Sequence, residues 1–112
     1  MRFDDYDTAA EATAIYPEAG TGSVAAVTYL ALGLGETGEI QGKVKKALRD
    51  DNGELSEARR EGILAEMGDV LWYLSRLAVE LGYSLSDVAA ANIEQLAARD
   101  ARGVLSGSGD NR

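Results

Sequence analysis

Residues 63–81 read ILAEMGDVLWYLSRLAVEL, and this run carries the clearest helical pattern in the chain. Its apolar side chains recur at steps of four and three residues, the period of an α-helix, at Ile63, Met67, Val70, Leu74, Leu77 and Leu81. The acids Glu66 and Asp69 lie beside this stripe and three positions apart, so they share one helix face. We therefore predict a helix from about Ser56 to Leu81 with two carboxylates next to its buried side.

The sequence before this helix predicts two more. A short amphipathic helix is expected over about residues 3–15, because the residue before Pro17 disfavours helical geometry. Ser23 is a suitable N-cap for a second helix that runs from Val24 towards Leu48. Three glycines weaken this second helix, which implies either close packing or a local bend; they are Gly33, Gly35 and Gly38.

Turn and capping residues organise the rest of the chain. Residues 50–53 read DDNG, a turn signal that favours the second and third helices as antiparallel neighbours. Gly82 is a good stop for the third helix. Ser84 and Asp87 have the spacing of a capping box, which opens a fourth helix that ends near Ala101.

These elements predict an all-α fold, a small antiparallel bundle of about four helices. The chain shows neither an internal repeat nor the alternating pattern of a strand. We expect a single domain over residues 1–112, in which residues 1–22 form an N-terminal helix and loop and residues 103–112 an irregular tail.

Composition removes several kinds of chemistry. The 112 residues include neither cysteine nor histidine, which excludes thiol nucleophiles, zinc thiolates, imidazole bases and His-ligated metals. Any metal held by this chain must be a hard cation bound by carboxylates, such as Mg²⁺ or Mn²⁺.

Acidic residues outnumber basic ones, 19 to 11, which gives a formal charge of −8. This excess disfavours nucleic acid or an anionic membrane as the default partner. Three aspartates near the start argue against a signal peptide and suit the positive end of a helix dipole; they are Asp4, Asp5 and Asp7. We expect a soluble, cytoplasmic protein.

Two pairs of acids form the strongest chemical signal. Glu36 and Glu39 lie on the second predicted helix, and Glu66 and Asp69 on the third, each pair three residues apart. An E-x-x-E pair alone is usually a solvated face. If the two helices are antiparallel neighbours, however, four carboxylates can face one another, and they repel unless divalent cations neutralise them. Lysines 43 and 46 continue the ridge of Glu36 and Glu39, as a Mg²⁺-bound polyphosphate would require.

Several segments resemble the MazG-like nucleoside triphosphate pyrophosphohydrolases of the all-α NTP pyrophosphatase superfamily. They are GLGETGE at residues 33–39, VKK at 44–46, EMGDVLWYL at 66–74, NIEQL at 92–96, Arg99, and the ending from residue 102. The resemblance covers about residues 25–112 and is more specific than either acidic pair.

The resemblance implies Mg²⁺ as cofactor, with Mn²⁺ as a possible substitute, and Glu36, Glu39, Glu66 and Asp69 as its ligands. Lys43 and Lys46 match positions that approach the phosphates. Asn92 and Arg99 match a segment associated with substrate binding, and Asp110 and Arg112 would add polar contacts from a tail that wraps a neighbour's site. A frayed terminus is the alternative for this tail.

Two positions depart from the family pattern. The substrate-binding segment has Gln95 where the family has lysine, so this position supplies no cation. Gly35 stands where some branches carry a second glutamate, so a general base assigned from those branches has no counterpart there. The proton could be accepted by Glu36 or Glu39, and the sequence does not choose between them.

The implied reaction converts a nucleoside triphosphate, ribo or deoxy, to the monophosphate and pyrophosphate by attack of metal-activated water on the α-phosphorus. The alternatives are a phosphoribosyl-ATP pyrophosphohydrolase and a non-catalytic helical oligomer or nucleotide-binding regulator. As in the family, we expect a homodimer or homotetramer. Trp72 either stacks on a base or, by preference, packs in the core or between subunits.

Overall fold

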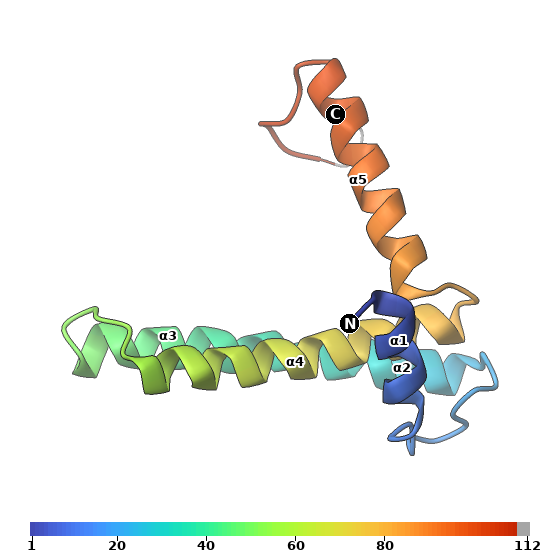
Figure 1. Cartoon of the computed structure of the whole chain (residues 1–112), viewed down its shortest axis with the longest axis horizontal. Coiled ribbons are helices and arrows are strands. Elements are labelled where there is room, and N and C mark those ends of the chain that lie inside the picture. The colour runs from blue at the N-terminus through green and yellow to red at the C-terminus, as the bar shows by residue number, and fades with distance from the viewer. Residues whose placement is uncertain (110–112) are drawn as a thin grey trace.

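The computed structural model describes residues 1–109, which form five α-helices and one 3-10 turn, with no strand in that range (Figure 1). In chain order the elements are α1 (Phe3–Glu11), α2 (Val24–Gly33), η1 (Leu34–Glu36), α3 (Thr37–Asp50), α4 (Glu57–Glu80) and α5 (Leu85–Ala101). The prediction of an all-α fold is confirmed. Asp110 and Arg112, predicted to contact substrate, lie outside the described residues.

The local signals for helix ends are confirmed. Ser23 caps α2 by accepting a hydrogen bond from the Ala26 amide at 3.1 Å. Ser84 and Asp87 form the reciprocal capping box at the start of α5. Between α3 and α4 the chain turns through left-handed geometry at Asn52, with φ of 55°, and at Gly53, with φ of 77°.

The first helix ends earlier than predicted, at Glu11 rather than near residue 15. The reason is a tertiary contact at Thr13. Its hydroxyl donates to the Ala10 carbonyl at 2.9 Å and accepts a hydrogen bond from Trp72 Nε1 at 2.8 Å. These contacts fix a turn at Thr13, and the following loop carries Tyr16 into the core.

The single helix predicted from Val24 towards Leu48 is divided into α2, η1 and α3. Of the two explanations offered for its glycines, close packing applies at Gly33. The backbone tightens into a 3-10 turn at residues 34–36, and Gly33 packs directly against the ring of Tyr73 on α4.

Asp7 has a different role from the one predicted, since it does not act on the dipole of α1. Its Oδ1 accepts a hydrogen bond from Ser75 Oγ at 2.6 Å, and its Oδ2 accepts one from the Leu85 amide at 2.9 Å. Asp7 therefore links α1 to both α4 and α5. Asp5 does serve the start of α1, because its Oδ2 accepts from the Arg2 amide at 3.0 Å.

Helix α4 is the centre of the fold. It contacts every other element, and it forms a long antiparallel hairpin with α3 (Figure 1). Among the described elements α5 contacts only α1 and α4, and it projects steeply away from the hairpin. The radius of gyration of 16.9 Å exceeds the value of about 13 Å expected for a compact chain of this length.

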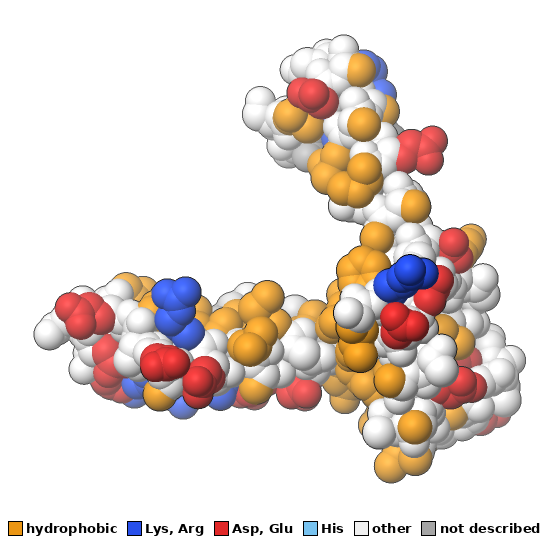
Figure 2. Space-filling view, in the orientation of Figure 1, with side chains coloured by type: hydrophobic (Ala, Val, Ile, Leu, Met, Phe, Trp, Pro, Cys, Tyr) orange, Lys and Arg blue, Asp and Glu red, His pale blue; other side chains and the backbone are white. Residues whose placement is uncertain are grey.

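The core is small and lies where the loop after α1 packs against α2 and α4. Tyr16, Ala26 and Leu30 form its buried cluster, and Trp72, Tyr73 and Leu77 pack against it. Many large apolar side chains elsewhere are exposed, and Figure 2 shows them along the hairpin and on α5. Within residues 1–109, none of the helices combines the length and apolar character that crossing a membrane requires.

Candidate functional site

Three of the four predicted carboxylates come together. Glu36 at the end of η1 and Glu66 and Asp69 on α4 each offer one oxygen, and these three oxygens lie within 4.8 Å of one another. Glu66 and Asp69 share a face of α4 because they are three residues apart. Glu36 reaches them because η1 packs against α4.

Glu39, the fourth predicted ligand, lies outside this cluster. It is exposed in the first turn of α3, after the 3-10 turn has tightened the backbone. A continuous helix would have placed Glu36 and Glu39 one above the other on the same face. In the structure Glu36 ends η1 and Glu39 lies in the first turn of α3, and of these two acids only Glu36 joins Glu66 and Asp69.

The lysines continue from the cluster along α3. Lys43 Nζ lies 3.4 Å from Glu66 Oε1. The Lys43 side chain passes close to Gly62 on α4, where a Cβ would lie 3.4 Å from its Nζ, an ordinary van der Waals contact. Lys46 is exposed one turn further along the helix. One ammonium beside three acids leaves the cluster with a net negative charge.

The donor set suits a hard divalent cation. All three groups are carboxylates, which is the ligand type that Mg²⁺ and Mn²⁺ prefer. Glu36 and Glu66 are partly buried and Asp69 is exposed, so the cluster is open to solvent on one side. Three of the four expected metal ligands therefore lie together in an arrangement that suits such a cation.

A small cavity of about 280 Å³ adjoins the cluster, lined by Glu36, Asp69, Trp72 and Tyr73. Burial raises the pKa of the Tyr73 hydroxyl, and the nearby Tyr29, Glu36 and Asp69 raise it further. The sequence patterns above assign no role to Tyr73, although its position four residues after Asp69 puts both on one face of α4.

Trp72 is partly buried and packs against the core, as the preferred prediction for it expects. Its ring lies edge-on to Tyr16 at a centroid distance of 6.1 Å and to Tyr73 at 5.1 Å. Its indole N–H donates to Thr13 Oγ1, so it faces the N-terminal segment.

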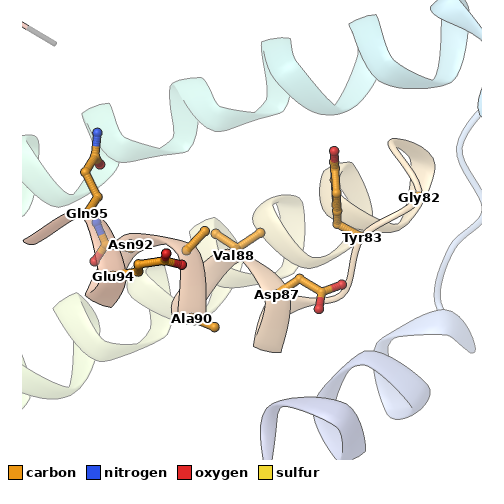
Figure 3. Close-up of a pocket in the computed structure, with 9 residues that line it drawn as sticks. Gly82, Tyr83, Asp87, Val88, Ala90, Asn92, Glu94 and Gln95 are labelled. Carbon is orange, nitrogen blue, oxygen red and sulfur yellow. The ribbon is translucent and has the colours of Figure 1, made fainter. Parts of the chain in front are cut away.

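The predicted substrate residues on α5 lie apart from the carboxylates. Asn92 and Gln95 line an open groove of about 1140 Å³ that follows the first half of α5 from Tyr83 and Asp87 (Figure 3). Because α5 does not contact η1 or α3, this groove and the carboxylate cluster are separate features of the described chain. Arg99 is buried, 8% exposed, and its carbonyl accepts from the Val104 amide at 2.9 Å where the chain folds back after α5.

An all-helical chain with clustered carboxylates, a neighbouring lysine and no histidine falls in the class of helical proteins whose carboxylates could hold a hard cation. Comparison with known proteins narrows this class. The family model for the MazG nucleotide pyrophosphohydrolase domain matches residues 25–104, and the chain belongs to this family.

One relative matches over its whole length. The Gene 37 protein of Mycobacterium phage L5 is 48% identical over 114 aligned positions that span all of both chains. No solved structure matches the chain. Family membership makes the chain a relative of hydrolases that act on nucleotide phosphoanhydrides.

The matched range 25–104 contains the carboxylate cluster, both lysines and the predicted residues on α5. Residues 1–24, which include α1 and Tyr16, lie outside it. The single domain over residues 1–112 stays a prediction.

Proposed function

We propose that this chain hydrolyses nucleoside triphosphates, ribo or deoxy, to the monophosphate and pyrophosphate in a Mg²⁺-dependent reaction. The observation that carries the proposal is the convergence of Glu36, Glu66 and Asp69 in a chain that the MazG family model matches. Mn²⁺ is the expected substitute, since it accepts the same oxygen ligands.

Glu36, Glu66 and Asp69 would hold the cation, which supplies positive charge to the triphosphate and lowers the pKa of a bound water. Glu39 is exposed in the next turn, where its carboxylate can join the ligand set or accept the proton of the attacking water. Either Glu36 or Glu39 could be that base.

Lys43 Nζ lies 3.4 Å from Glu66 Oε1, an oxygen of a carboxylate that would hold the cation. From this position the ammonium of Lys43 can bind an oxygen of a phosphate held by that cation. Lys46 extends the same positive edge along α3. Together the two lysines would balance the charge of the departing pyrophosphate.

We also propose that the chain acts as a homodimer or homotetramer. Its radius of gyration is large, its core is small, and apolar side chains such as Leu64, 67% exposed, and Ile93, 65% exposed, are in contact with solvent. Because Asn92 lies apart from the carboxylates in one chain, a second copy is the source from which such a side chain would reach the site.

The direct test is to incubate the purified protein with a panel of NTPs and dNTPs and Mg²⁺ and to measure pyrophosphate and monophosphate. Asp69→Asn and Glu66→Gln should each lower kcat/KM by about 100-fold or more, because each removes a charged ligand. Glu61→Gln is the matched control, since it makes the same change at an exposed acid of α4 outside the cluster. Undiminished activity of Asp69→Asn would contradict the proposed site.

The same experiment separates the alternatives. A phosphoribosyl-ATP pyrophosphohydrolase would turn over that substrate far faster than any NTP in the panel. A non-catalytic oligomer would release no pyrophosphate, and its melting temperature would not respond to Mg²⁺.

A further inference from the structure

We infer that Tyr73 is a positioning residue for the carboxylate cluster: its ring occupies the space left by the missing side chain of Gly33 and so holds Glu36 against Glu66 and Asp69. This inference deepens the proposed function and rests on it for the identity of the metal. It concerns two residues that bear no ligand atom of the cluster.

The contact between Gly33 and Tyr73 admits no side chain at position 33. A Cβ there would lie 2.6 Å from Cζ of the Tyr73 ring and closer still to Cε1 and Cδ1. Real Cβ contacts do not occur at such distances, so the ring lies directly on the backbone of α2 at its last residue. Gly35, two residues along, has nothing within 4 Å of the equivalent position.

The ring cannot move away from Gly33 without disturbing the core. Trp72 lies perpendicular to it at a centroid distance of 5.1 Å. Trp72 in turn packs edge-on against the buried Tyr16 and donates its indole N–H to Thr13 at 2.8 Å. The N-terminal segment, which lies outside the family match, therefore holds Trp72, which in turn packs against the Tyr73 ring.

The register of the two elements carries this contact to the carboxylates. In a 3-10 turn, side chains three residues apart lie one above the other, so Glu36 projects from the same side of η1 as Gly33. On α4, Asp69 and Tyr73 are four residues apart and also share a face. The contact of Tyr73 with Gly33 at the end of α2 and that of Asp69 with Glu36 at the end of η1 thus follow one another along α4.

Two consequences follow for metal binding. The thickness of the ring sets how closely η1 approaches α4, and hence the separation of Glu36 from its two partners. The glycine makes that approach possible. Supporting residues of this kind typically change metal affinity by about 10- to 100-fold when altered.

The test is Mn²⁺ affinity, measured by calorimetry on the full chain without nucleotide, alongside urea unfolding of each variant. Gly33→Ala and Tyr73→Ala should each weaken Mn²⁺ binding by about 10-fold or more. Gly35→Ala, the same change in the same turn but facing open space, should bind as the wild type does. Tyr73→Phe should also bind normally, since the ring and not the hydroxyl makes the contact.

The double variant Gly33→Ala/Tyr73→Ala separates a shared contact from two independent defects. Removal of the ring makes room for the methyl group, so the double variant should bind no more weakly than Tyr73→Ala alone. Additive losses would overturn the inference. So would wild-type affinity in Tyr73→Ala, an outcome that stays informative if Gly33→Ala does not fold.

Two further outcomes distinguish this inference from the proposed function. A chain that binds Mn²⁺ with the expected variant pattern but releases no pyrophosphate would refute the function and support the inference. An active chain whose Tyr73→Ala variant loses unfolding free energy but keeps its Mn²⁺ affinity would refute the inference alone. A wild type that binds no Mn²⁺ overturns both.

Discussion

The two halves of α4 differ in how far the rest of the chain buries their side chains. The half that follows Asp69 carries all the buried residues of this helix: Ser75, Arg76, Ala78 and Glu80. The half before it carries the carboxylates beside exposed apolar side chains such as Leu64 and Met67. One chain therefore buries side chains on only one half of its central helix. The half that carries the carboxylates has no fully buried side chain.

The buried half makes polar contacts with the N-terminal segment as well as apolar ones. The carboxylate of Glu80, 7% exposed, accepts from the Tyr16 hydroxyl at 2.5 Å and from the Gly20 and Gly22 amides at 2.6 and 2.7 Å. Burial alone would raise the pKa of Glu80, but these three hydrogen bonds and Arg76 lower it below its usual range. The same environment raises the pKa of Tyr16 to about 12, chiefly through burial and then through Glu80.

The largest expected effect on stability comes from removing the polar contacts of the buried half of α4. Glu80→Ala should lower the free energy of unfolding by about 3–5 kcal/mol, because it leaves a hydroxyl and two amides without their acceptor. Tyr16→Phe, which removes one of these hydrogen bonds and keeps the ring, should cost about 1.5–3 kcal/mol. Urea unfolding measures both. Glu61→Gln on the other half should stay within about 0.5 kcal/mol, and an equal loss there would remove the contrast.

The pH dependence of stability should show the same contact. Since the folded pKa of Glu80 lies below its ordinary value of 4.5, its contribution is present above that pH and is lost as the pH falls through the folded value. Since the folded pKa of Tyr16 lies above its ordinary value of 10.0, its contribution is complete below pH 10.0 and is lost as the pH rises towards about 12.

The alkaline loss should be about 2 kcal/mol and absent from Tyr16→Phe, as measured by urea unfolding across this range. An identical alkaline limb in the variant would show that other groups cause it.

The smallest expected effect on stability comes from a substitution in the half of α4 that precedes Asp69. Leu64→Lys should change the unfolding free energy of the monomer by no more than about 0.5 kcal/mol, because the side chain is 67% exposed. It should nevertheless weaken assembly, as measured by sedimentation equilibrium. Ile15→Lys, at a position 92% exposed in the N-terminal loop, is the control that leaves assembly unchanged. Equal weakening by both would mean that charge alone drives dissociation.

Local signals predicted most of the fold. The caps at Ser23 and Ser84 act on amides three residues away, so they can be identified without tertiary structure. The pairing of Glu66 with Asp69 likewise depends only on helical period. For the same reason, the boundaries of α4 follow from its own pattern.

What could not be predicted depends on residues distant in sequence. The contact of Gly33 with the ring of Tyr73 joins residues forty positions apart, and only the folded chain shows that Glu39 lies outside the cluster. The role of Asp7 requires Ser75 and Leu85 to be in place. Helical spacing alone therefore places one more acid in the cluster than the structure does.

The placement of both halves on one continuous helix limits how the length of this chain can vary. One residue inserted between Asp69 and Ser75 would turn the carboxylates by about 100° and shift them by about 1.5 Å relative to the buried half. Glu80 and Glu66 could then not both keep their partners. The turn at residues 51–56 is under no such constraint, so relatives should differ in length there and keep the spacing within α4 unchanged.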